Sequence, residues 1–159
     1  MDMIPGRTNR LKLQADKAGI YGGQCAEFCG GAHSLMGFVV VAHEPADWQR
    51  WLDTRLAQSA AATPISAEAL RGRELFSEVG CAACHRVAGS AAQGLSGPDL
   101  THVGSRRSLG AGILPNTRGT LIGWIGDSQS IKPNNRMPAY RSLQAAELNA
   151  LAAYMESLK

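Results

Sequence analysis

The pentapeptide CAACH, Cys81–His85, constrains this chain of 159 residues more than any other feature. Two cysteines three positions apart, followed directly by a histidine, form the attachment signature of covalently bound haem. On a helical turn both thiols reach the vinyl groups along one porphyrin edge, and the histidine then lies beneath the ring. A thioredoxin-like dithiol belongs in a βαβ setting, and half of a zinc site needs two further ligands nearby. The motif therefore predicts a haem bonded through Cys81 and Cys84, with His85 on its iron.

An electron-transfer haem needs a second axial ligand, and methionine raises the reduction potential relative to a second histidine. Met137 lies in the loop segment NNRMPAY, where Pro138 stiffens the chain. Met155 is the competing candidate, but its place on the apolar stripe of a C-terminal helix is typical of a core residue. In the segment GPDL, the carbonyl group of Pro98 could accept a hydrogen bond from the ring nitrogen of His85 that does not bind iron. We therefore expect Met137 on the iron and Pro98 behind His85.

The segments before and after the haem motif have the residue patterns of helices. Ser66 predicts the N-cap of a helix over AEALRGRELFSEV, a shorter helix is expected at residues 119–127, and an apolar stripe predicts a C-terminal helix. Together with the haem motif and the GPDL and Met-Pro loops, this order resembles a class I cytochrome c domain. The resemblance implies an all-α domain over residues 67–159, in which the first and last helices cross and Gly72 allows their close approach.

A second group of metal-binding residue types lies in the segment QCAEFCGGAHSLM. It combines thiolates, an imidazole and a thioether, which are soft ligands that select copper over hard cations. Zinc sites rarely include methionine. A disulfide between the two cysteines is an alternative, although it leaves the histidine and the methionine unexplained, and coincidence is another. The candidate residues are Cys25, Cys29, His33 and Met36.

The segments on either side of this group predict strands and then a helix. Alternating apolar positions in RLKLQADKAGIY predict a half-buried strand with Leu11 and Leu13 on its inner face. The β-branched residues of SLMGFVVVAH predict a buried strand. Pro45 then suits the first turn of a helix in EPADWQRWLDTRLAQSAA, and the small residues AAATPIS predict a linker.

The stretch GQCAEFCGGAHSLMGFVVVAH resembles the copper-binding loop of cytochrome c oxidase subunit II. The resemblance implies a dinuclear copper centre, CuA, in a cupredoxin β-barrel. In that family pattern Cys25 and Cys29 bridge the coppers, Glu27 ligates through its backbone carbonyl, His33 binds one copper and Met36 the other. A further copper histidine of the family lies upstream of the segment with which this chain begins. We therefore expect the copper site of this chain alone to be incomplete.

These patterns together predict an α+β chain of two parts. Residues 1–44 are expected to form the C-terminal strands of a partial cupredoxin β-barrel, residues 45–66 a helix and linker, and residues 67–159 an all-α class I cytochrome c domain. No apolar run approaches the roughly 18 residues that a membrane-spanning helix needs. The resemblance to subunit II implies membrane anchoring through helices upstream.

A subunit II joined to a cytochrome c resembles the caa-type terminal oxidases of bacteria. The resemblance implies electron transfer from haem c to CuA and on to subunit I of a proton-translocating oxidase, where oxygen is reduced. It also implies the other oxidase subunits as partners, a cytochrome c or a quinol-oxidising complex as electron donor, and a location on the periplasmic, outer face of the inner membrane.

Two other functions are compatible with the same residues. One is a free-standing haem c electron carrier, and the other is a copper-handling module with a vestigial cupredoxin segment. The net charge is only +3, and the sequence has no block of basic residues, which argues against nucleic-acid binding.

Overall fold

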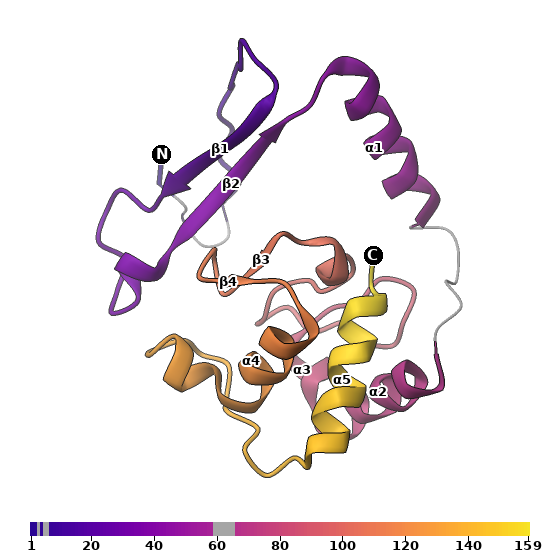
Figure 1. The fold of residues 1–159 in the computed structure, drawn as a ribbon. Helices are drawn as coiled ribbons and strands as arrows, with labels where there is room; N and C mark the ends of the chain where they lie inside the picture. Colours follow the sequence, from indigo (N-terminus) through magenta and orange to yellow (C-terminus); the bar gives the residue numbers. More distant parts are fainter. Residues whose placement is uncertain (3, 5–6, 59–65) are drawn as a thin grey trace.

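The computed structural model describes residues 1–2, 4, 7–58 and 66–159 and contains two parts (Figure 1). The first part is a β-hairpin that continues into a helix: β1 (Gly19–Gln24), β2 (Gly37–Ala42) and α1 (Pro45–Gln58). The second part holds four helices and a small sheet: α2 (Ala67–Glu78), α3 (Cys81–Cys84), β3 (Ser108–Leu109), β4 (Leu114–Pro115), α4 (Arg118–Ile131) and α5 (Ala145–Ser157). The chain is thus a mixed α/β protein with small antiparallel sheets and a helical region.

The hairpin begins later in the chain than the alternating pattern predicts. β1 pairs antiparallel with β2, starting with Gly19 opposite Ala42. Leu11 and Leu13 lie outside any strand and are 63% and 68% exposed. The prediction of a strand at these residues was wrong. No described segment pairs with residues 10–18, so their alternating apolar side chains have no sheet to pack against.

Three glycines, Gly19, Gly22 and Gly23, lie inside β1, and the partner strand covers one of them, Gly23. A Cβ on Gly23 would lie 2.2 Å from the ring of Phe38, which fills that space. β2 was expected to be buried, but Phe38 and Val39 are among its exposed residues. The described residues contain no closed barrel, and a two-stranded hairpin is compatible with many β folds.

α1 forms where the sequence predicts it, but its aromatic side chains do not enter a core. Trp48 and Trp51 are both exposed, and their rings stack on each other at 5.1 Å, with His43 stacked on Trp51. The predicted linker lies almost entirely at residues 59–65, outside the described part of the chain. Ser66 follows, and its side chain caps α2 as predicted.

The first and last helices of the second part, α2 and α5, cross in close contact. A Cβ on Gly72 would lie 1.9 Å from the carbonyl oxygen of Ala150. Next to this crossing, the ring of Phe76 meets the ring of Tyr154 edge to face at 5.7 Å. The packing reason predicted for Gly72 is confirmed, because only a residue without a side chain lets the two backbones come this close.

One hydrophobic core lies among α2, α4 and α5, with Leu151 as its most buried large side chain. α4 extends beyond the helix predicted at residues 119–127, and it contains one non-helical residue, Asp127. Within the described residues, no helix combines the length and the apolar character that crossing a membrane requires.

The second part is not purely helical, which corrects the all-α prediction. β3 and β4 pair through Leu109 opposite Leu114. The turn between them uses Gly110 and Gly112, whose φ angles of +63° and +88° suit glycine. The segment before α4 therefore contains a short hairpin.

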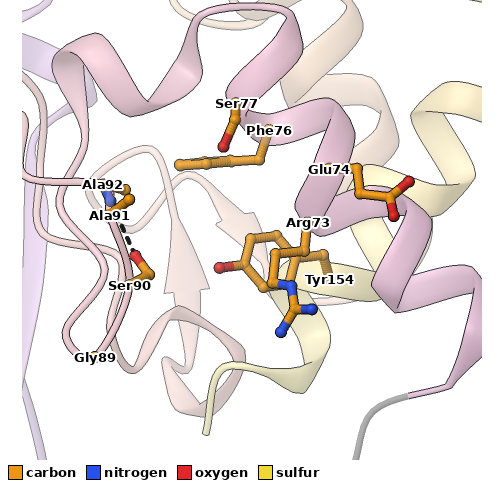
Figure 2. A pocket seen from close by; sticks show the side chains of 9 residues that line it. All are labelled: Arg73, Glu74, Phe76, Ser77, Gly89, Ser90, Ala91, Ala92 and Tyr154. Carbon is orange, nitrogen blue, oxygen red and sulfur yellow. Dashed lines mark hydrogen bonds between the residues drawn. The ribbon is translucent and has the colours of Figure 1, made fainter.

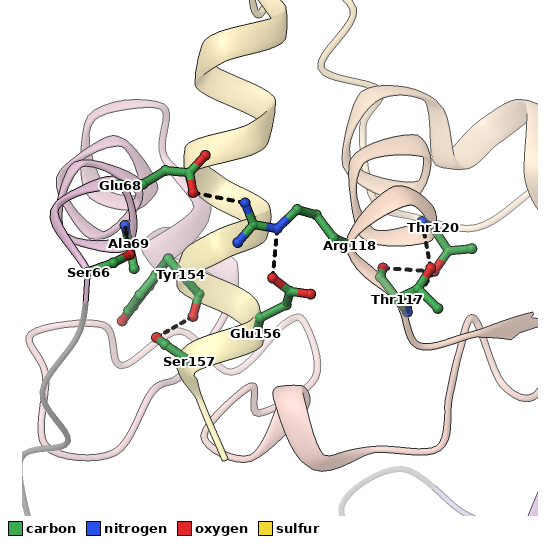
Figure 3. A network of polar contacts seen from close by, with 9 residues as sticks. All are labelled: Ser66, Glu68, Ala69, Thr117, Arg118, Thr120, Tyr154, Glu156 and Ser157. Atoms are coloured by element: carbon green, nitrogen blue, oxygen red, sulfur yellow. Dashed lines mark hydrogen bonds and ion pairs between the residues drawn. The ribbon is translucent and has the colours of Figure 1, made fainter.

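Arg118 at the start of α4 ties the three core helices together by two ion pairs (Figure 3). Its Nε lies 2.7 Å from Oε2 of Glu156 on α5, and its Nη1 lies 2.8 Å from Oε2 of Glu68 on α2. All three side chains are half-exposed, so each pair contributes at most about 1 kcal/mol. The ion pairs thus link α2, α4 and α5, and these helices pack together mainly through the hydrophobic core.

Candidate metal and haem sites

The loop between β1 and β2, residues 25–36, is hereafter the metal loop. The N–H of Cys25 donates to the carbonyl oxygen of Met36 at 2.9 Å, which closes the loop at its base. Gly30 adopts a left-handed backbone with φ +127°, and a short 3₁₀ turn at His33–Leu35 follows. The glycines of this segment thus fold the loop back on itself, and its side chains converge.

The metal loop brings the predicted copper ligands together around one sulfur atom. Sγ of Cys29 lies 3.6 Å from Sγ of Cys25, 3.7 Å from Nδ1 of His33 and 3.2 Å from Sδ of Met36. Sγ of Cys25 lies 3.3 Å from the carbonyl oxygen of Glu27, the atom expected to ligate. The predicted donors therefore form one cluster on a single loop.

The chemistry of this donor set fits copper. The thiols of Cys25 and Cys29 are free, and two sulfurs beside a thioether and an imidazole make a soft site. A hydrogen bond with the Cys25 thiol raises the pKa of Cys29, and the ammonium group of Lys132 acts in the opposite direction. A metal displaces the thiol protons when it binds, so its affinity at this cluster depends on pH.

The haem motif folds as predicted for its chemistry, with its cysteines on α3. The N–H of His85 donates to the carbonyl oxygen of Cys81 at 3.0 Å and closes the turn. Burial raises the pKa of the Cys81 thiol, which suits an uncharged thioether there. Nδ1 of His85 lies 2.8 Å from the carbonyl oxygen of Pro98, and as donor in this bond it leaves Nε2 as the ring nitrogen available to a metal.

Two glycines bring the next loop directly onto the haem motif. A Cβ on Gly97 would lie 2.7 Å from Cε1 of His85, and one on Gly94 would lie 2.4 Å from the carbonyl carbon of Cys84. The N–H of Gly97 also donates to the carbonyl oxygen of Cys84 at 2.7 Å. The loop therefore fixes the orientation of the His85 ring from one side.

The substitution Gly97→Ala is expected to displace the His85 ring and to lower the free energy of unfolding by about 1–3 kcal/mol, the usual cost of overpacking. Chemical denaturation of the haem-loaded protein measures this loss. Gly119→Ala is the matched control, because Gly119 is exposed on α4 with open space around it. Equal stability of the two variants would contradict the close packing on His85.

Hydrogen bonds to both the N–H and the carbonyl oxygen of Met137 hold its backbone in place. Its carbonyl oxygen accepts from Oγ of Ser128 at 3.1 Å and from Nε2 of Gln129 at 2.6 Å, and its N–H donates to Oδ1 of Asn135 at 2.8 Å. Its side chain is half-buried against the hydrophobic core. The competing Met155 is buried inside α5. Met137 is thus the methionine on a fixed loop, while Met155 belongs to the core.

A cavity with a volume of about 360 Å³ lies beside α2, and the ring of Phe76 in its wall is 6.5 Å from the ring of His85 (Figure 2). Figure 2 shows the rings of Phe76 and Tyr154 directed toward the loop at Ser90–Ala92. None of the predicted haem or copper residues lines this cavity. The cavity is a groove at the edge of the core.

The metal loop lies against the second part of the chain, a contact that the sequence reasoning missed. The N–H of Gly37 donates to the carbonyl oxygen of Ala111 at 2.8 Å, and a Cβ on Gly31 would lie 2.6 Å from Nδ2 of Asn134. Among the described residues, Ala111 and Asn134 are the non-glycines with positive φ, at +66° and +65°. No local signal predicts this contact, because it depends on two turns far apart in the sequence.

Comparison with protein families matches both parts of the chain. Residues 69–159 match the family model described as cytochrome c. Residues 1–43 match the model described as the periplasmic domain of cytochrome c oxidase subunit II.

Individual relatives align with both parts of the chain. The chain is 39% identical over 159 residues to the cytochrome c oxidase subunit 2 of Alkalihalophilus pseudofirmus, covering all of this chain and 45% of that protein. It is 34% identical over 152 residues to the subunit 2 of Bacillus subtilis, covering 93% of this chain and 42% of that protein. The chain thus spans less than half the length of these relatives. The solved c-type cytochrome SorU from Sinorhizobium meliloti is 26% identical, with a TM-score of 0.42 over 57% of this chain and 90% of that chain.

Proposed function

Because the chain belongs to the cytochrome c family through residues 69–159 and joins that domain to a C-terminal part of the subunit II periplasmic domain, we propose that it is the electron-transfer end of a terminal oxidase subunit. In this proposal the chain passes electrons from haem c to CuA and on to subunit I. The reduction of oxygen belongs to the whole complex, and this chain has no catalytic residue of its own.

The haem residues each have a separate task in this proposal. A bound haem or copper centre supplies one-electron chemistry, which side chains do not. Cys81 and Cys84 would hold a haem through thioether bonds, and His85 and Met137 would bind its iron. The carbonyl group of Pro98, 2.8 Å from His85 Nδ1, keeps the imidazole in the tautomer that ligates through Nε2.

The copper residues share one short loop whose base is already closed by a backbone hydrogen bond. Cys25, Cys29, His33 and Met36 would bind copper through their side chains, and Glu27 would bind it through its carbonyl oxygen. A loop held in this way moves little when the charge of its site changes, which suits a relay. The upstream histidine of the family pattern completes the site in the longer subunit.

We assign residues 1–44 to the end of the cupredoxin domain, 45–66 to the helix and linker, and 67–159 to the cytochrome c domain. The longer protein is anchored in the membrane by upstream helices and exposes this part on the periplasmic face. Its partners are the other oxidase subunits and, as donor, a cytochrome c or a quinol-oxidising complex. A tether between two redox domains replaces a bimolecular encounter by an effective concentration in the millimolar range.

The observation that carries this proposal is the convergence of the soft donors on Sγ of Cys29, at 3.2 to 3.7 Å. The test uses the full-length subunit with haem attached. We expect two coppers per haem and, after rapid reduction of the haem, its reoxidation by the copper centre at a rate independent of protein concentration.

Two results would replace the proposal by another function. A reoxidation rate that rises in proportion to protein concentration would indicate a free-standing electron carrier. Rapid exchange of bound copper with free chelator would indicate copper handling, because a relay site holds its metal.

A further inference from the structure

Two segments of the cytochrome c domain contact the metal loop or the residue that directly follows it. The turn at Gly110–Gly112 contacts it through Ala111 and Gly37, and the turn after α4 contacts it through Asn134 and Gly31. Gly31 lies two residues from Cys29, and Gly37 directly follows Met36. Both contacts therefore lie next to predicted copper ligands.

Lys132 lies between these two turns and is buried. Its Nζ donates to the carbonyl oxygen of Gly110 at 2.8 Å, and the side chain is among the few buried polar ones, with 9% exposed. Within the described part of the chain, no carboxylate forms an ion pair with it. The carbonyl group that it binds belongs to the turn whose next residue, Ala111, accepts a hydrogen bond from Gly37, directly after Met36.

A structural role alone does not explain a cation at this place. A neutral donor satisfies the carbonyl oxygen of Gly110 equally well, whereas a buried charge without an ionic partner is destabilising. The charge itself is therefore the property to account for.

We propose that Lys132 of the cytochrome c domain acts through its positive charge on the metal loop and raises the reduction potential of the copper site. The inference rests on the proposed function and deepens it. The site accepts one electron and becomes more negative by one unit, and the haem iron that gives this electron is oxidised by one unit. A fixed positive charge favours the more negative form through Coulomb attraction, which weakens with distance and with exposure to solvent.

This arrangement gives electron transfer a direction. The haem domain supplies the charge that makes its own acceptor more oxidising, and it does so only while the two turns contact the metal loop. Separation of the two parts removes the charge and the favourable difference in potential together.

The test compares variants of the full-length subunit loaded with haem and copper. Lys132→Gln removes the charge and keeps a donor for Gly110, and Lys132→Arg keeps the charge. We expect the glutamine variant to shift the equilibrium of the electron between haem and copper about tenfold toward the haem, which is ~59 mV for a one-electron couple. The arginine variant is expected to stay near wild type. Lys12→Met, which removes an exposed charge, is the matched control.

Redox titrations that follow the haem and copper absorption separately give the readout, with copper content measured on each sample. An unchanged copper potential in Lys132→Gln would overturn the inference, and so would a shift of the haem potential alone. If that variant does not fold, Asn134→Asp adds a negative charge beside Gly31 on a residue type that also tolerates positive φ. Asn134→Asp should lower the reduction potential of the copper site by a smaller amount than Lys132→Gln does. An unchanged copper potential in Asn134→Asp would overturn the inference.

These outcomes are separable from failure of the proposed function. A wild-type subunit that binds no copper would overturn both proposals. Copper present at two per haem, with a potential that does not respond to either variant, would overturn this inference alone.

Discussion

A full-length subunit that carries Cys29→Ser is expected to lose its bound copper while its haem stays covalently attached. Sγ of Cys29 is the atom nearest to the other donors, at 3.6 Å from Cys25, 3.7 Å from His33 and 3.2 Å from Met36. A serine hydroxyl is a hard and weakly acidic ligand, so it replaces neither the bridge nor its negative charge. Because losing an outer-shell partner already costs 10–100-fold in metal affinity, we expect a loss of at least about 100-fold.

Copper and iron analysis of the purified subunit measures this result. The matched variant is Cys84→Ser, which removes one thiol from the haem motif and leaves the metal loop intact. It should keep its copper and carry a haem with a single thioether bond. Wild-type copper content in Cys29→Ser would show that the sulfur cluster is not the copper site.

The second large effect is expected from Gly72→Val at the crossing of α2 and α5. A Cβ on Gly72 would lie 1.9 Å from the carbonyl oxygen of Ala150 and 2.9 Å from Cβ of Tyr154. A backbone carbonyl in a helix cannot move aside cheaply, so the two helices must separate. We expect the free energy of unfolding to fall by about 3 kcal/mol, the upper end of the usual cost of overpacking. This is a large fraction of a typical stability of roughly 5–15 kcal/mol.

Denaturant unfolding of the haem-loaded protein, followed by circular dichroism, gives the free energy. Gly119→Val is the control, because it places the same side chain on a helix where nothing lies within 4 Å of the new Cβ. Valine and glycine have similar low helix propensities, so this control should stay within ~0.5 kcal/mol of wild type. Equal losses in both variants would mean that helix propensity, and not the crossing, sets the cost.

Most of the candidate ligands could be found in the sequence because they lie in short segments. All five candidate copper residues lie within twelve positions of one loop, and the two haem cysteines lie on one turn of helix. Spacing of this kind restricts which side chains can meet, whatever the rest of the chain does. The cap of α2 by Ser66 and the tight approach at Gly72 follow from equally short patterns.

The strand predicted around Leu11 and Leu13 failed for the opposite reason. Alternation shows which residues could face a sheet, but a strand needs a partner, and β2 pairs with the glycine-rich segment Gly19–Gln24 instead. Phe38 on β2 covers Gly23 and supplies the apolar contact that the glycines lack.

The sequence alone determined the types of the candidate ligands, their grouping around two short segments, and the family to which residues 69–159 belong. Only the tertiary structure decided that the metal loop lies against Ala111 and Asn134, and that Lys132 is buried between those two turns. The physical reason is the range of the interactions. Ligand spacing is set by bonds within a few residues, whereas the position of a charge beside a distant loop depends on how the whole chain packs.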